Sequence, residues 1–186
     1  MQDYKVIFIG RSGVGKTTAI NSVSEISPVS TEVLATDSSC PGKEKTTVAF
    51  DYGEVTIPGG INRMRLYGAP GQQRFSFMWD ILDRSSTGFI LLVDNTLPDA
   101  LEDTRAYLKA HKDKLTGSHA VALVGIVKYD LSPSPDIECY RRLLWDEGFT
   151  FEAAVLDARC ADSVLLLLKI LFRRLERQRN NEVMKK

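Results

Sequence analysis

Residues 10–17 read GRSGVGKT and directly follow the apolar run VIFI at residues 6–9. The stretch matches the pattern G-x-x-x-x-G-K-[ST], and helical periodicity begins at its end, over residues 16–25. Glycines let such a loop curl so that successive backbone N–H groups and the helix N-terminus face an anion. The sequence therefore predicts a phosphate-binding loop between a strand and a helix, in preference to a simple glycine turn.

The residues of this loop have distinct predicted roles. We expect Lys16 to reach the outer phosphates and to assist their transfer, and the Thr17 hydroxyl to bind Mg²⁺. The expected phosphate-contacting residues within the loop are Gly10, Arg11, Ser12, Gly13, Val14, Gly15, Lys16, Thr17 and Thr18.

Apolar runs and helical periodicity alternate along the rest of the chain. The runs at 6–9, 89–93 and 121–127 are nearly continuous and rich in β-branched residues, as in strands buried on both faces. We expect further strands at 46–57, 62–67 and 151–156, and helices at 16–25, 73–86, 98–114, 135–147 and 162–179. This order predicts an α/β fold with a six-stranded, mostly parallel sheet and about five helices, and residues 26–45 are expected to form a long loop.

Length and charge limit the possible functions. The 186 residues suit one domain, expected over residues 1–179, with a polar, disordered tail at 180–186. The 24 basic and 24 acidic side chains cancel, so we expect no nucleic-acid partner. Cys40, Cys139 and Cys160 lack the spacing of a zinc site or a disulfide framework, which favours reduced thiols in a cytoplasm.

The apolar run at 164–172 is nine residues long, whereas a helix needs roughly 20 to span a bilayer. We therefore expect no integral membrane segment. Arginines between residues 173 and 179 would allow peripheral association with an anionic membrane, but the intervening glutamates favour a solvated face. Additional apolar residues of the last helix, among them Leu166, fit either a fully covered helix or a homodimer surface.

The segment VKYD at residues 127–130 indicates which base accompanies the phosphates. A carboxylate at Asp130 can accept hydrogen bonds from both N1–H and the 2-amino group of guanine, whereas adenine lacks these donors. Lys128 would lay its aliphatic stem along the base, although a solvated Lys and Asp at a strand end is the simpler alternative. In DAR at 157–159, the Ala158 N–H would meet guanine O6, and Arg159 completes the expected guanine-binding set.

Taken in order, the phosphate loop, VKYD and DAR resemble the motifs of Ras-like small GTPases across essentially the whole chain. The sequence looks most like the prokaryotic type, which includes MglA-like gliding-motility GTPases and the GTPases of conserved actinobacterial operons. The resemblance implies a P-loop NTPase fold, GTP or GDP as ligand with Mg²⁺, and a molecular switch whose partners are roadblock-type regulatory proteins.

The resemblance also implies two switch segments. Thr47 in KTTVAFDYG would be the Mg²⁺-binding threonine of the first switch, because TVAFDY aligns with the family pattern T-I-G-x-D-F; Thr46 is the alternative. The stretch LYGAPGQQRF at 66–75 stands where the family has D-T-A-G-Q-E. Gly71 would donate its N–H to the γ-phosphate, and Gln72 would orient the attacking water.

Three positions depart from the family pattern. Gly68 replaces the acidic residue that holds Mg²⁺ through a water, and Asp94 is the nearest candidate to take over that role, with a purely structural role for Asp94 as the alternative. Val127 replaces the Asn of N-K-x-D, which predicts a lower nucleotide affinity. Ser12 lies where its side chain can crowd Gln72, which predicts slow hydrolysis.

No arginine is fixed by the sequence at the γ-phosphate, since Arg11 is expected to point outward and Arg74 lies in a more mobile segment. Two alternatives remain beside a GTP-hydrolysing switch. One is a guanine-nucleotide-binding module without turnover, which Gly68, Ser12 and Val127 together would suit. The other is a P-loop kinase or ATPase, which Asp130 disfavours.

Overall fold

The computed structural model describes residues 3–27, 29–35, 46–57, 62–69, 87–117 and 120–184, and of residues 29–35, 46–50, 87, 182 and 183 only the backbone. Seven strands form one sheet within these residues, in the spatial order β2-β3-β4-β1-β5-β6-β7. They are β1 (Asp3–Ile9), β2 (Val29–Ala35), β3 (Thr46–Thr56), β4 (Arg63–Gly68), β5 (Thr87–Asp94), β6 (Ala120–Val127) and β7 (Ala153–Val155). The pairs from β4 to β7 are parallel, whereas β3 is antiparallel to both β2 and β4.

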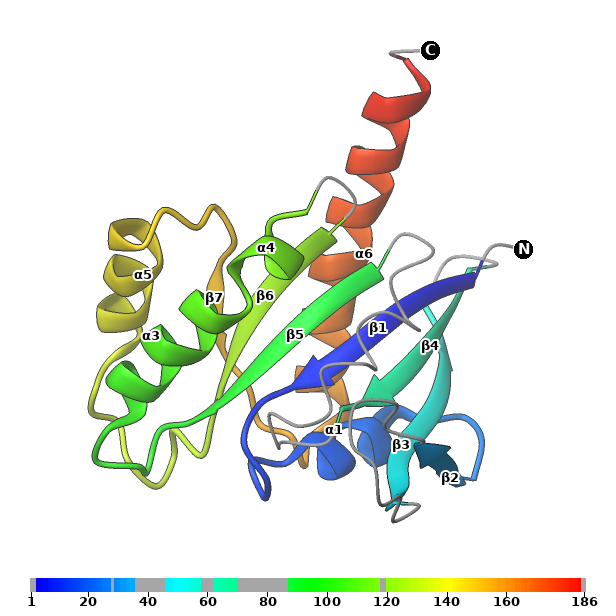
Figure 1. The fold of residues 1–186 in the computed structure, drawn as a ribbon, viewed down its shortest axis with the longest axis horizontal. Helices are drawn as coiled ribbons and strands as arrows, with labels where there is room; N and C mark the ends of the chain where they lie inside the picture. Colours follow the sequence, from blue (N-terminus) through cyan, green and yellow to red (C-terminus); the bar gives the residue numbers. More distant parts are fainter. Residues whose placement is uncertain are drawn as a thin grey trace, which may run out of the picture.

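Helices cover both faces of the sheet (Figure 1). The described helices are α1 (Lys16–Val23), α3 (Ala100–Ala110), α4 (Lys112–Leu115), α5 (Ile137–Asp146) and α6 (Ala161–Val183). One apolar cluster joins α1 and α6 to the sheet through residues such as Phe8, Ile20 and Leu168. A second cluster joins α3 and α5 to the opposite face through residues such as Leu108 and Tyr140. The predicted α/β class is confirmed, and the helix predicted at 73–86 lies outside the described residues.

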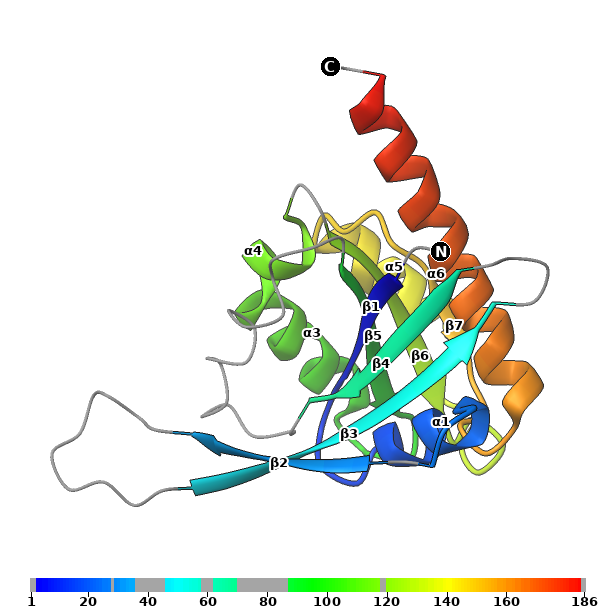
Figure 2. The same cartoon turned by 90° about the vertical axis from the view of Figure 1, so that its right-hand side faces the viewer.

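The sheet has one strand more than the sequence predicted, because β2 lies within the expected loop at 26–45. Its sequence VSTEVLA is rich in β-branched residues, which favour strands, and it pairs antiparallel with the first half of β3. The two strands form a hairpin that extends beyond the rest of the sheet (Figure 2).

Helix α6 is longer than predicted. It continues to Val183, so the chain is helical beyond residue 179, where we expected a disordered tail to begin. Residues 180–183 contain no Gly or Pro that would end a helix. The side chains of α6 that pack on the sheet are Val164, Leu167, Leu168, Leu171 and Leu175. Phe172 packs edge-on against Tyr4, and Leu166 is exposed. No helix within the described parts of the chain is long and apolar enough to cross a membrane.

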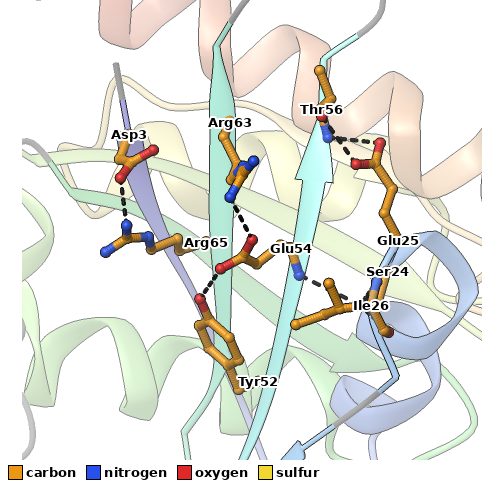
Figure 3. Close-up of polar contacts among 9 residues, drawn as sticks. All are labelled: Asp3, Ser24, Glu25, Ile26, Tyr52, Glu54, Thr56, Arg63 and Arg65. Atoms are coloured by element: carbon orange, nitrogen blue, oxygen red, sulfur yellow. Dashed lines mark hydrogen bonds and ion pairs between the residues drawn. The ribbon is translucent and has the colours of Figure 1, made fainter. Parts of the chain in front are cut away.

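Polar contacts anchor the end of α1 to β3 (Figure 3). The Glu25 carboxylate accepts hydrogen bonds from the backbone N–H and the hydroxyl of Thr56, both at 2.9 Å. The Glu25 N–H donates to the Glu54 carbonyl at 2.8 Å, and the Glu54 side chain accepts from Arg63 at 3.0 Å. These contacts fix α1 along β3, and the first turn of α1 carries the end of the phosphate loop.

Candidate nucleotide-binding site

The loop between β1 and α1 has the backbone shape that the glycines predict. Gly10, Gly13 and Gly15 have φ angles of 136°, 76° and 108°, in the region that disfavours residues with a Cβ. Gly15 is the N-cap of α1, and no side chain caps the helix there. The first N–H groups of α1 are therefore oriented towards an external acceptor, which suits a phosphate.

Lys16 lies across the loop with its side chain mostly buried. Its ammonium donates to the carbonyl oxygens of Gly10 at 3.0 Å and Arg11 at 2.8 Å. Burial lowers the pKa of Lys16, and the nearby Asp51 carboxylate opposes this effect. The Lys16 ammonium thus lies within the loop, where it can bind the oxygens of an anion.

The other side chains of the loop point in different directions. Arg11 forms an ion pair with Asp103 of α3, which turns its guanidinium away from the loop, as expected. Val14 is 2% exposed and packs into the core, so only its main chain can face a ligand. Ser12, in the loop, and Thr18, in the first turn of α1, are exposed.

Thr17 contacts an acidic residue that the sequence did not single out. Its hydroxyl donates to Oδ2 of Asp51, in β3, at 2.5 Å. Thr47 lies four residues before Asp51 in the same strand, roughly 13 Å away along β3. Its partner in β2 is Leu34. A Mg²⁺ contact from both Thr17 and Thr47 therefore requires another conformation of this hairpin, and the predicted role of Thr47 stays a prediction.

Asp94 is not where a metal-holding residue is needed. Oδ2 of Asp94 pairs with the Lys128 ammonium at 2.5 Å, and Oδ1 accepts from the N–H of Thr96 at 3.0 Å and from its hydroxyl at 2.6 Å. Burial alone would raise the pKa of Asp94, but these hydrogen bonds outweigh it and hold the pKa below its ordinary value. The structure thus corrects the suggestion that Asp94 replaces the missing carboxylate, because one of its oxygens binds Lys128, directly after β6, and the other binds Thr96, just after β5.

Asn95 fixes the loop that follows β6. Its side chain is buried and donates to the carbonyls of Ser132 at 2.5 Å and Pro135 at 3.2 Å, while its carbonyl oxygen accepts from the Tyr140 hydroxyl at 2.7 Å. Its backbone N–H donates to the Val127 carbonyl at 3.1 Å. Although Val127 replaces the expected Asn, a buried Asn directly after the neighbouring strand β5 holds this loop in place.

The predicted guanine-binding residues meet at one end of the sheet. Arg159 donates to Asp130 at 2.9 Å and to Asp157 at 2.9 Å. The hydrogen bonds that it donates, first to Asp157 and then to Asp130, raise the pKa of Arg159. A Cβ built on Gly15 would lie 3.5 Å from the Cβ of Ala158. The phosphate loop therefore adjoins the loop at residues 156–160, between β7 and α6, which we call the third loop. Lys128 has a φ of 58°, which turns the chain sharply into the loop that carries Asp130.

Two predicted residues, Gly71 and Gln72, lie outside the described residues. Of Thr46 and Thr47 only the backbone is described. Within the described residues, no group of three or more His, Cys, Asp or Glu side chains is arranged to hold a metal ion. A single carboxylate and a hydroxyl suit Mg²⁺ only together with nucleotide phosphates and waters, which is the usual manner of Mg²⁺ binding at phosphate sites.

Comparison with known families agrees with this geometry: residues 5–147 match the model of the Ras family. The chain belongs to the Ras family. This Ras family chain is 26% identical to Ras-related protein Rab-25 of Homo sapiens, over 97% of the chain and 81% of that protein. It is 25% identical to Ras-related protein YPTC6 of Chlamydomonas reinhardtii, over 83% of the chain and 68% of that protein.

An uncharacterized protein of the archaeon Methanocaldococcus jannaschii is 36% identical to the Ras family chain over 92 residues, which is 49% of the chain and 50% of the archaeal protein. Membership of the Ras family makes the chain a small GTP-binding switch protein, with GTPase activity and Mg²⁺-dependent binding of GTP and GDP as general family properties. Its relation to the prokaryotic MglA-like type stays a prediction.

Proposed function

We propose that the chain is a switch that binds GTP with Mg²⁺, hydrolyses it slowly to GDP and changes partners between the two states. The observation that supports this most is the meeting of the three loops. Gly15 of the phosphate loop adjoins Ala158, and the neighbouring Arg159 contacts Asp130. A nucleotide whose phosphates lie at α1 would therefore have its base at Asp130.

Guanine recognition would use the Asp130 carboxylate. One of its oxygens accepts from Arg159, and the pair is well exposed, so this ion pair contributes little stability on its own. The guanidinium keeps the carboxylate oriented beside the third loop. The N1–H and 2-amino group of guanine would replace water, and in part Arg159, as donors to Asp130.

At the phosphates, Lys16 would exchange the carbonyls of Gly10 and Arg11 for β- and γ-phosphate oxygens. The N–H groups of the loop would bind the remaining oxygens, with Gly71 as a further donor from the second switch. Bound Mg²⁺ neutralises the charge that develops on the phosphate oxygens. Thr17 would hold this ion, with Thr47 joining it when the hairpin changes conformation.

Hydrolysis would be slow because Gln72 would orient the water, whereas among the described residues the phosphate loop carries no arginine other than Arg11. Arg11, the nearest arginine in sequence, is held by Asp103 of α3. An arginine that stabilises the transition state is worth about 10³ to 10⁵ in rate, so its absence decides the rate. We expect an activating protein to supply what the chain lacks.

The two nucleotide states would differ in the hairpin that carries Thr47 and in the segment that carries Gln72. Partners would read these segments, and by resemblance to the prokaryotic type they include roadblock-type regulators in a cytoplasm. A homodimer through the exposed face of α6 at Leu166 is an alternative assembly.

A single-turnover assay with γ-labelled GTP tests the proposal. Wild type should release phosphate slowly, and Gln72→Leu should release none while it binds GTP equally well. In Asp130→Asn the amide can accept from N1–H and donate to the 2-oxo group of xanthine, so preference should move from GTP to XTP. Fast hydrolysis without a partner would refute the slow switch. Tight GTP binding with no phosphate release from wild type would instead favour a module without turnover, which the turned-away Arg11 also supports.

A further inference from the structure

Gly68 stands at the end of β4, where the family pattern has an acidic residue. Two strands flank it, since Gly68 lies opposite Phe8 of β1 and opposite Asp51 of β3. Asp51 is therefore the cross-strand neighbour of the position from which a carboxylate is missing.

The side chain of Asp51 occupies the space beside Gly68. A Cβ built on Gly68 would lie 2.9 Å from Oδ2 and 3.0 Å from Cβ of Asp51, and 3.2 Å from Cδ1 of Ile20. Distances this short require neighbouring atoms to shift, so a residue with a Cβ at position 68 would displace the Asp51 side chain from its present position. The glycine is explained by the aspartate of the adjacent strand.

Helix α1 is brought close enough for this aspartate to reach the phosphate loop. A Cβ on Gly53, two residues after Asp51, would lie 2.8 Å from Ile20 and 2.9 Å from the Ser24 hydroxyl, so α1 packs directly on the backbone of β3. In this arrangement the Thr17 hydroxyl donates to Asp51 at 2.5 Å. Asp51 also lies near enough to Lys16 to influence its pKa.

We propose that Asp51 supplies the carboxylate that positions Mg²⁺ in this protein, in place of the acidic residue absent at Gly68. This proposal rests on the nucleotide binding proposed above. A hydroxyl that donates its proton to a carboxylate keeps its lone pairs for a metal, so Asp51 orients Thr17 as a ligand. Its carboxylate also accepts hydrogen bonds from the waters that Mg²⁺ retains at phosphate sites. Asp51 is thus a positioning residue.

The release of a fluorescent GDP analogue, measured over a range of free Mg²⁺ concentrations, tests this role. In wild type, Mg²⁺ should slow release with a defined midpoint concentration. Asp51→Asn should raise that midpoint 10- to 100-fold, the usual effect of removing a group that orients a metal ligand. Glu54→Gln, an acid-to-amide change in the same strand whose carboxylate bonds Arg63 and Tyr52, should leave the midpoint unchanged.

A carboxylate moved between the strands provides the decisive variant. Gly68→Ala should displace Asp51 and raise the midpoint, whereas Asp51→Ala combined with Gly68→Asp should restore it towards the wild-type value. Thermal melting without nucleotide separates this effect from a loss of folding. If wild type binds the analogue but Asp51→Asn keeps the wild-type midpoint, or the exchange variant is no better than Asp51→Ala, the role of Asp51 is wrong. If wild type binds no guanine nucleotide at all, the proposed function itself fails.

Discussion

Gly10 and Gly13 lie in the same loop with positive φ angles but in different surroundings, so replacing each with alanine tests the loop geometry. A Cβ on Gly10 would lie 2.5 Å from the carbonyl oxygen of Leu92, which belongs to β5 and cannot move without disturbing the sheet. A Cβ on Gly13 would have no atom within 4 Å. The two variants therefore share backbone strain, and only Gly10→Ala adds a clash.

The magnitude follows from these contacts. Positive φ costs a residue with a Cβ about 1–2 kcal/mol, which is the whole effect expected for Gly13→Ala. Crowding against a fixed backbone atom adds about 1–3 kcal/mol, so Gly10→Ala should be less stable than Gly13→Ala by about 2 kcal/mol. With an m-value of about 2 kcal/mol/M, its urea midpoint should be lower by about 1 M.

Urea unfolding of the nucleotide-free variants, followed by circular dichroism, measures this difference. Working without nucleotide matters because a ligand that binds only the folded state would add its own stabilisation. Equal midpoints for Gly10→Ala and Gly13→Ala would show that the loop does not lie against the Leu92 carbonyl of β5.

Three further predictions concern charges and buried polar groups. The pKa of Asp94 is lowered in the folded protein. The ionised Asp94 therefore stabilises the fold above its ordinary pKa of 3.8, and this stabilisation is lost as the pH falls through the folded-state pKa. In urea unfolding, Asp94→Asn should lower the midpoint at about pH 6 and much less at about pH 3. The pKa of Lys16 is also lowered, so the free energy of unfolding of wild type should rise as the pH approaches 10.5. Urea unfolding between about pH 8 and pH 10 measures this rise in wild type and in Lys16→Met. An equal rise in the two proteins would contradict the prediction. Asn95→Ala leaves the Tyr140 hydroxyl without its acceptor and two carbonyls without their donor. In urea unfolding it should lower the free energy of unfolding by about 2–4 kcal/mol, against about 1 kcal/mol for Tyr140→Phe. Similar losses in the two variants would show that the side chain of Asn95 does not make these hydrogen bonds.

Sequence patterns predicted the parts of the site that depend on local order. The glycines and Lys16 follow one another in a single loop, and Asp130 follows a strand whose apolar run is unmistakable. Each of these patterns extends over only a few residues, so sequence spacing alone predicts that the motif follows one strand and Asp130 another.

The parts that the sequence did not predict depend on pairing between distant segments. Asp51 faces Gly68 only because of the register between β3 and β4, and a shift of one residue would turn Asp51 to the other face. Asn95, directly after β5, similarly donates hydrogen bonds to the loop that follows β6, which is distant in sequence. Strand β2 was missed because its Ser, Thr and Glu residues resemble loop composition until a partner strand is present. Gly68 itself was the available signal, since a glycine in a strand often marks a close approach.

We propose that the chain binds guanine nucleotides where the phosphate loop meets the loops at Asp130 and Ala158. Calorimetric titration of nucleotide-free protein with GDP and with ADP, both at saturating Mg²⁺, measures this binding. The structure predicts one GDP bound per chain and at least a hundredfold weaker binding of ADP, which corresponds to about 2.7 kcal/mol. No heat with GDP, or equal affinity for both nucleotides, would contradict it.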